Sequence, residues 1–241
     1  PMERIEDITA KDWIANNISL ENAARPLLLS NFLPPIFDNY IAVLGTPGLI
    51  DNFPFDKIKQ PSNTIEQINT NVEIWKQFKI YTHDSSDDFY RPTTYAELSS
   101  IFNLQYDIDV IKFLPWKTQG IKTLISETTQ RLDRIVSALS IGEELNIFME
   151  DYWRFLALDE LFPYSENAAY KLSQNEYFDL MKRTGYDSTM YLYPTNKSWC
   201  LVNIEDLEYN ILAFKNTVSD NFNNLSLKDT FRLKYNDIIF L

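Results

Sequence analysis

The chain has 241 residues, 45% of them hydrophobic and 23% charged, with a formal net charge of −12 and an isoelectric point near 4.6. This composition excludes a largely disordered chain. The negative charge disfavours contact with phosphate backbones and anionic lipid, so we expect neither a nucleic-acid partner nor a membrane.

Residue types that build reactive or cofactor sites are scarce. A single cysteine, Cys200, excludes an intramolecular disulfide and zinc sites with several thiolates, and a single histidine, His83, excludes multi-histidine metal sites. The chain has five glycines, and they form no G-x-G-x-x-G or Walker pattern. This argues against a glycine-rich loop that binds nucleotide phosphates. We therefore expect no cofactor and no metal.

The absence of a leader-like segment and of a run of about 18 apolar residues predicts a cytoplasmic protein. Pro1 stands ahead of Met2 and is interpreted as a residue left by cloning.

Along the first third of the chain the pattern alternates between short regular elements and irregular segments. Residues 7–17 predict a helix capped by Thr9, and residues 36–44 predict a strand buried on both faces for part of its length. Residues 45–48 (GTPG) predict a turn, followed by an irregular segment to residue 62.

The middle of the chain predicts three helices and one strand. Residues 62–78 carry apolar side chains at helical spacing and have three candidate caps. The apolar positions are Ile65, Ile68, Val72 and Trp75, and the caps are Ser62, Asn63 and Thr64.

Residues 83–92 predict an exposed loop, and residues 93–102 a helix with a Thr94-x-x-Glu97 capping box. Residues 107–116 predict a strand. Residues 124–139 predict the clearest helix, capped by Ser126 and ended by Gly142. Its apolar stripe consists of Leu132, Ile135, Val136 and Leu139.

In the last third, residues 143–156 and 167–183 fit a helix or a strand equally well. Residues 188–194, 198–204 and 207–214 predict strands, with a turn at 194–198 and a break at Glu205–Asp206. Residues 214–225 predict a helix and residues 231–241 an extended segment. These ranges cover the chain to its last residue.

No repeat or flexible linker is visible, and 155–170 is the one weak candidate for a domain boundary. The elements together predict one compact α+β domain over residues 1–241, with a mainly antiparallel sheet flanked by helices.

The segment 191–214 (YLYPTNKSWCLVNIEDLEYNILAF) holds the candidate site. A nucleophilic Cys200 would need a nearby base, and His83 lies far away in sequence, so a buried strand cysteine is the better interpretation. Acidic residues occur in six local pairs, about the number that chance supplies among 34 acidic residues.

The binding residues that we single out are Tyr193, Trp199, Glu205 and Asp206. Exposed aromatic side chains would mark a contact with a protein or a sugar, whereas buried ones would belong to the core.

The same segment resembles the C-terminal signature of a family of uncharacterised bacterial single-domain proteins. Tyr193-Pro194 takes the place of the family's Trp-Pro, and Glu205-Asp206 takes the place of its acidic pair. Ser198-Trp199-Cys200 matches the family's pattern of a small residue followed by Trp-Cys. Residues 33–47 are similar to its Pro-x-Phe-x-x-Tyr stretch, but Gly45-Thr46-Pro47 replaces the usual His-Pro. The resemblance implies a bacterial cytosolic protein and assigns no catalytic residue.

From these observations we expect a non-catalytic interaction protein, of an immunity or antitoxin-like kind, that binds a basic protein partner. A carboxylate-based hydrolase acting on a sugar or polyol is the first alternative. A small-molecule sensing module is the second.

Overall fold

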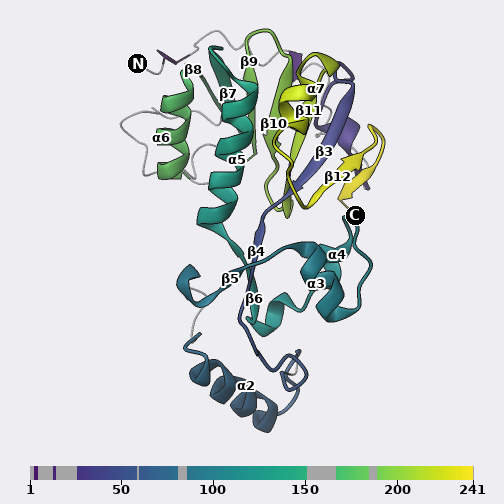
Figure 1. Ribbon diagram of the computed structural model, residues 1–241, viewed down its shortest axis with the longest axis vertical. Coiled ribbons are helices and arrows are strands. Elements are labelled where there is room, and N and C mark those ends of the chain that lie inside the picture. Colours follow the sequence, from purple (N-terminus) through teal and green to yellow (C-terminus); the bar gives the residue numbers. More distant parts are fainter. Residues whose placement is uncertain are drawn as a thin grey trace. The chain divides into compact units, whose positions relative to one another are not determined.

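The computed structural model describes residues 3–4, 13–14, 26–58, 60–80, 86–150, 167–184 and 189–240. Contacts within the chain group it into two compact units (Figure 1). The sheet unit comprises residues 1–44 and 133–241, and the inserted unit comprises residues 45–132. The candidate boundary at 155–170 lies mostly outside the described residues, and no sequence feature marks either junction.

The sheet unit contains an eight-stranded sheet in which each strand is antiparallel to its neighbours. In spatial order the strands are β1 (Glu3–Arg4), β8 (Asn167–Leu172), β7 (Leu145–Glu150), β9 (Met190–Pro194), β10 (Trp199–Asn203), β11 (Tyr209–Phe214), β3 (Asn39–Leu44) and β12 (Thr230–Leu233). This arrangement confirms the predicted α+β class with a mainly antiparallel sheet.

The central strands are buried on both faces. Every residue of β9, β10 and β11 is buried, as are five of the six residues of β3. A continuous run of apolar residues places apolar side chains on both faces of the sheet, because successive side chains of a strand point to opposite sides. The strands predicted at 188–194, 198–204 and 207–214 are confirmed, and the strand predicted at 36–44 begins at residue 39.

Helices flank this sheet. Helix α5 (Ile125–Leu139) belongs to the sheet unit from Asp133 onward, and the described residues of the unit also form helices α6 (Gln174–Thr184) and α7 (Ser219–Asn223). The short elements are η1 (Leu29–Asn31), η6 (Asn216–Val218), β2 (Leu27–Leu28) and β13 (Ile238–Phe240). The predicted apolar stripe of α5 is buried, as expected. Ser126 lies inside the first turn of α5 and not at its cap. Gln174 of α6 donates to the Ser137 hydroxyl of α5 (2.8 Å), and Figure 1 shows the two helices beside each other.

The two segments that fitted a helix or a strand are resolved by the structure. Of the first segment, residues 145–150 form β7 and residues 151–156 lie outside the described residues. Residues 167–183 contain both elements, β8 followed by α6. The switch occurs at Ser173. Its hydroxyl accepts from the Glu176 amide (3.4 Å), while the Glu176 carboxylate accepts from the Ser173 amide (2.8 Å), which is a reciprocal capping box.

Three further predictions concern segments near the two ends of the chain. Of the helix predicted at 7–17, only Trp13 and Ile14 are described, and both are helical. The helix predicted at 214–225 is present as η6 and α7, and the extended end consists of β12 and β13 with a turn between them.

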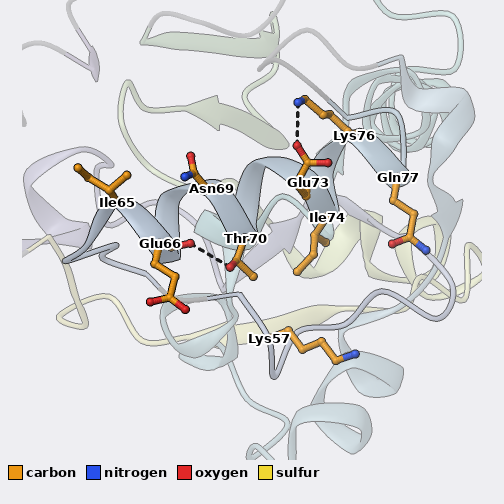
Figure 2. A pocket seen from close by; sticks show the side chains of 9 residues that line it. All are labelled: Lys57, Ile65, Glu66, Asn69, Thr70, Glu73, Ile74, Lys76 and Gln77. Atoms are coloured by element: carbon orange, nitrogen blue, oxygen red, sulfur yellow. Dashed lines mark hydrogen bonds and ion pairs between the residues drawn. The ribbon is translucent and has the colours of Figure 1, made fainter.

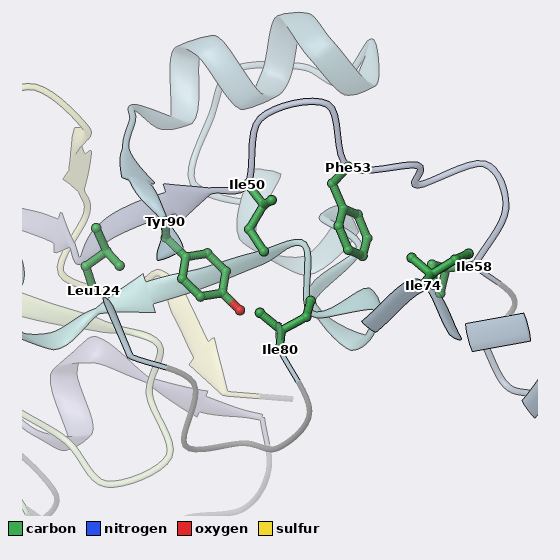
Figure 3. Close-up of a cluster of buried hydrophobic side chains, with 7 residues drawn as sticks. All are labelled: Ile50, Phe53, Ile58, Ile74, Ile80, Tyr90 and Leu124. Atoms are coloured by element: carbon green, nitrogen blue, oxygen red, sulfur yellow. The ribbon is translucent and has the colours of Figure 1, made fainter. Parts of the chain in front are cut away.

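The inserted unit has a small sheet of β5 (Arg91–Pro92), β4 (Thr46–Leu49) and β6 (Ile121–Leu124), antiparallel throughout. Its helices are α2 (Ile65–Gln77), η2 (Asp87–Phe89), α3 (Tyr95–Phe102), α4 (Val110–Phe113) and η3 (Trp116–Thr118). Buried side chains from the sheet, from α2 and from the loops between them form its core (Figure 3). They are Ile50, Phe53, Ile58, Ile74, Ile80, Tyr90 and Leu124.

Thr64, one of the three candidate caps of α2, and Thr94, the predicted cap of α3, are the observed caps. The hydroxyl of Thr64 accepts from the Gln67 amide, and that of Thr94 accepts from the Glu97 amide, each at 3.2 Å. The Glu97 carboxylate does not complete a capping box. It accepts from Thr93 (2.6 Å) and pairs with Arg91 (2.8 Å).

The predicted turn at 45–48 is wrong, because residues 46–49 form β4, the central strand of the small sheet. The glycines serve close packing there. A Cβ on Gly48 would lie 2.6 Å from Leu124 Cδ2 and 2.7 Å from Tyr90 Cβ. A glycine in a strand marks such a close approach as readily as it marks a turn.

The predicted strand at 107–116 is also wrong, since α4 and η3 occupy it. The Asp107 side chain accepts from the Asp109 amide (2.9 Å), and the Asp107 carbonyl accepts from the Val110 amide (3.2 Å). These bonds start a helical turn that outweighs the weak alternation of apolar residues. Of the exposed loop predicted at 83–92, residues 83–85 lie outside the described residues, and the rest is mostly exposed as predicted. It is not irregular, however, because it contains η2 and β5, and Tyr90 is buried.

The close packing around Gly48 leads to a test of the corrected strand. Gly48→Ala should lower the free energy of unfolding by about 1–3 kcal/mol, because the added methyl group must displace Leu124 and Tyr90. Urea denaturation measures this change. Gly142→Asn is the control, because Gly142 has φ +71° and open space around it. Its cost should stay below about 1 kcal/mol, and an equally small cost for Gly48→Ala would contradict the packing argument.

The capping box at Ser173 predicts a pH dependence. The amide and hydroxyl of Ser173 lower the pKa of Glu176 from its ordinary 4.5 to about 2. The folded state therefore favours the carboxylate, so its contribution to stability is complete above pH 4.5 and disappears as the pH falls towards 2. The stability difference between wild type and Glu176→Gln should shrink over that range. Asn175→Ala, an exposed neighbour, should show a difference that does not change with pH.

Candidate functional site

The segment 191–214 forms three adjacent strands of the sheet. Two of the four predicted binding residues, Tyr193 and Trp199, are buried, while Glu205 is half-buried and Asp206 is exposed. The aromatic pair therefore belongs to the core, and the acidic pair lies on the turn between β10 and β11.

Trp199 joins the sheet to a helix. Its indole Nε1 donates to the Leu139 carbonyl oxygen at the end of α5 (3.1 Å). Its cross-strand partner is Phe214, whose ring centroid lies 5.1 Å from that of Phe222 in α7. This face of the sheet is thus closed by apolar packing and by one satisfied indole N–H.

Tyr193 lies on the opposite face, in an aromatic group with Trp13 and Phe37. Its ring packs edge-on against Trp13 with centroids 4.8 Å apart, and Trp13 packs similarly on Phe37 at 6.2 Å. The ammonium of Lys197 lies 5.3 Å from the Trp13 ring centroid. Burial raises the pKa of Tyr193 to about 12, opposed by a hydrogen bond with Trp13. The phenol therefore stays protonated at neutral pH and does not act as a base.

Cys200 is fully buried, and burial raises the pKa of its thiol far above the ordinary range. The prediction of a buried strand cysteine is confirmed. A thiol without thiolate character is a poor nucleophile. The other half of a Cys–His pair, His83, lies outside the described residues.

The acidic turn, which we define as Glu205, Asp206 and Glu208, is held in a fixed backbone conformation. The Glu205 amide donates to the Thr189 hydroxyl (3.1 Å), and the Leu207 amide donates to the Ile204 carbonyl oxygen (3.1 Å). Asp206 adopts φ +65°, a conformation that Asp tolerates better than most residues. The turn therefore presents acidic side chains at one end of a rigid sheet.

Acidic residues are unevenly divided between the two units. The inserted unit carries 11 of the 34 acidic and 9 of the 22 basic residues, so the sheet unit carries 23 and 13. The corresponding net charges are −2 and −10. The acidic character predicted for the whole chain thus comes almost entirely from the sheet unit.

Exposed apolar side chains show the opposite distribution. Within the described ranges, ten large hydrophobic residues are exposed, and seven of them belong to the inserted unit. These seven are Ile65, Ile68, Phe89, Ile101, Tyr106, Phe113 and Ile125. No sequence signal predicts these exposed residues, because apolar residues at helical spacing, such as those of α2, are expected to pack inward.

A shallow groove of about 980 Å³ runs along α2 (Figure 2). Glu66, Thr70 and Ile74 point to the side where Lys57 lies, and Ile65 and Asn69 point away from it. Charged groups of both signs rim the groove, and Lys76 pairs with Glu73 across one helical turn (2.8 Å). No convergent set of polar groups distinguishes this groove as a small-molecule site.

Among the described residues, His, Cys, Asp and Glu form no group of three or more that could hold a metal ion. Within the same ranges, no helix has the length and apolar character needed to cross a membrane.

Comparisons with protein-family models, with curated proteins and with solved structures gave no match to this chain. The site is therefore interpreted from its own geometry.

Burial of Cys200 predicts that its thiol is unreactive in the folded protein. With a disulfide reagent at pH 8, native protein should show no thiol release over minutes, and one equivalent should appear on unfolding in guanidinium. The reason is that both access and thiolate formation require opening of the sheet. Cysteine added at the exposed position Asp206 (Asp206→Cys) is the control and should react within seconds. Rapid release from the native wild type would contradict the burial of Cys200.

Proposed function

We propose that this chain is a non-catalytic interaction protein that binds a basic protein partner, in the manner of an immunity or antitoxin-like protein. The observation that carries the proposal is the excess of acidic over basic residues in the sequence of the sheet unit, 23 against 13. A field of one sign accelerates the encounter with a partner of the opposite sign and rejects like-charged competitors.

The acidic turn is the part of this surface that we assign to the contact. Its backbone is fixed by hydrogen bonds at Glu205 and Leu207, so little conformational entropy is lost when a partner binds. Asp206 and Glu208 are exposed and can meet Arg or Lys side chains in trans.

The reactive groups of the same segment support a binding role over a catalytic one. Burial holds the Cys200 thiol and the Tyr193 phenol in their protonated forms. A carboxylate-based hydrolase and a small-molecule sensor are the alternative hypotheses, and neither gains support from an observation on the described residues.

The proposal is tested by capture of a partner and by the kinetics of its binding. Immobilised protein should retain a basic protein from lysate of the native host at about 50 mM salt. With that partner purified, neutralising the acidic turn (Glu205→Gln, Asp206→Asn, Glu208→Gln) should lower the association rate about 10-fold and flatten its salt dependence. Stopped-flow fluorescence measures both quantities.

A matched control neutralises three acidic residues of the inserted unit, Asp56→Asn, Glu66→Gln and Glu127→Gln. It changes the net charge equally and should alter the rate less than about 3-fold. If the control slows association as much as the acidic-turn variant, the turn is not the contact. If no basic protein is retained at low salt, the proposed function is wrong.

A further inference from the structure

The inserted unit has a sheet and a hydrophobic core of its own. The core residues shown in Figure 3 all belong to this unit, and so do the three partly buried rings that pack against them, Phe55, Trp75 and Phe78. The small sheet of β5, β4 and β6 lies within the same limits. The buried cluster and the strand pairing of this unit are therefore built from one continuous segment of the chain, residues 45–132.

The two ends of the small sheet are held together by its own pairing. Thr46, the first residue of β4, lies opposite Leu124, the last residue of β6. The Thr46 amide also donates to the Thr128 hydroxyl in α5 (2.9 Å). Residues directly opposite each other in an antiparallel pair have Cα atoms about 4.5–5.5 Å apart. The segment is thus closed by bonds within the inserted unit.

Helix α5 passes from the inserted unit into the sheet unit at Asp133. The C-terminal half of the helix is fixed by the sheet unit, because the Leu139 carbonyl oxygen accepts from Trp199 Nε1 (3.1 Å) and the Ser137 hydroxyl accepts from Gln174 (2.8 Å). Helices lose turns from their ends without breaking bonds further along. Asp is a preferred N-cap residue, so a helix shortened to Asp133 has a suitable first residue.

Apolar burial is unevenly divided between the two units. The inserted unit comprises more than a third of the chain, but it contributes 15 of the 53 buried hydrophobic residues in the described ranges. Its strands have two to four residues, whereas the central strands of the large sheet have five or six. Because stability increases with the apolar surface that is buried, the inserted unit should be the less stable of the two.

We propose that the inserted unit opens and refolds as a cooperative unit of its own while the eight-stranded sheet stays folded. The opening exposes the core of Figure 3 to water and leaves β9, β10 and β11 in place together with the acidic turn. The proposal goes beyond the proposed function, because it concerns a conformational change in the other unit and requires no partner.

Tryptophan residues report on both units of the full-length protein. Trp75 and Trp116 lie in the inserted unit, where their indole N–H groups donate to the carbonyl oxygens of Thr118 (2.9 Å) and Ile111 (2.6 Å). Trp199 reports on the sheet. Protein labelled with fluorotryptophan is titrated with urea and followed by fluorine NMR, with signals assigned from variants that replace one tryptophan at a time by phenylalanine. The native signals of Trp75 and Trp116 should disappear together, about 1 M urea or more before that of Trp199.

Two matched variants distinguish separate unfolding from shared unfolding. Ile74→Val changes the core of the inserted unit, Ile211→Val changes β11, and each loss is small enough to leave the protein folded. In native-state hydrogen exchange, Ile74→Val should speed exchange at the amides of β4, β6 and α2 about 2- to 10-fold. Ile211→Val should speed exchange in β10 and β11 by a similar factor and change the first set of amides less than about 2-fold.

Three outcomes would overturn the proposal. They are one urea transition shared by all three tryptophan signals, loss of the Trp199 signal first, and an equal rise in exchange at both sets of amides in Ile211→Val. Each would show that the chain unfolds as one unit or in the opposite order. Failure of the proposed function would change none of these measurements, because no partner is present in them.

Discussion

Burial of both faces of the central strands is the constraint on which the sheet unit depends. A strand such as β10, with all five residues buried, needs a cover on each side and pairing on both edges. The neighbouring strands β9 and β11 supply the pairing. Trp199 and its bond to Leu139 close one face, and the ring of Tyr193 packs against Trp13 on the other. Segments distant in sequence are thereby fixed to the same three strands.

The same burial determines what the strands can do chemically. In a low-dielectric interior the charged form of an acid is penalised, which raises the pKa of Cys200 and of Tyr193 and leaves both groups protonated. The recognition that we propose therefore uses groups outside the sheet interior, namely the carboxylates of the acidic turn.

Much of the sheet unit could be predicted from sequence because its signals are local. The runs at 188–214 are continuous and apolar, the turns carry Pro194 and Asn196, and the stripe of α5 has helical period. The features that could not be predicted depend on contacts through space. Gly48 is indistinguishable from a turn glycine until Leu124 and Tyr90 are placed beside it. The buried face of α2 is likewise set by Ile74 and Asn71, and of its apolar stripe Trp75 packs against the core while Ile65 and Ile68 are exposed.

In the candidate site, the predicted break at Glu205–Asp206 is present as a turn between β10 and β11, but the sequence could not tell whether the neighbouring aromatic residues were exposed. Native-state hydrogen exchange of the amides of Trp199–Val202 and Ile211–Ala213 tests most directly whether these strands are an interior. If they are, exchange should occur only through global unfolding, with opening free energies within about 1 kcal/mol of the value from denaturant. Exchange through local openings several kcal/mol below the global value would show that these strands are not buried on both faces.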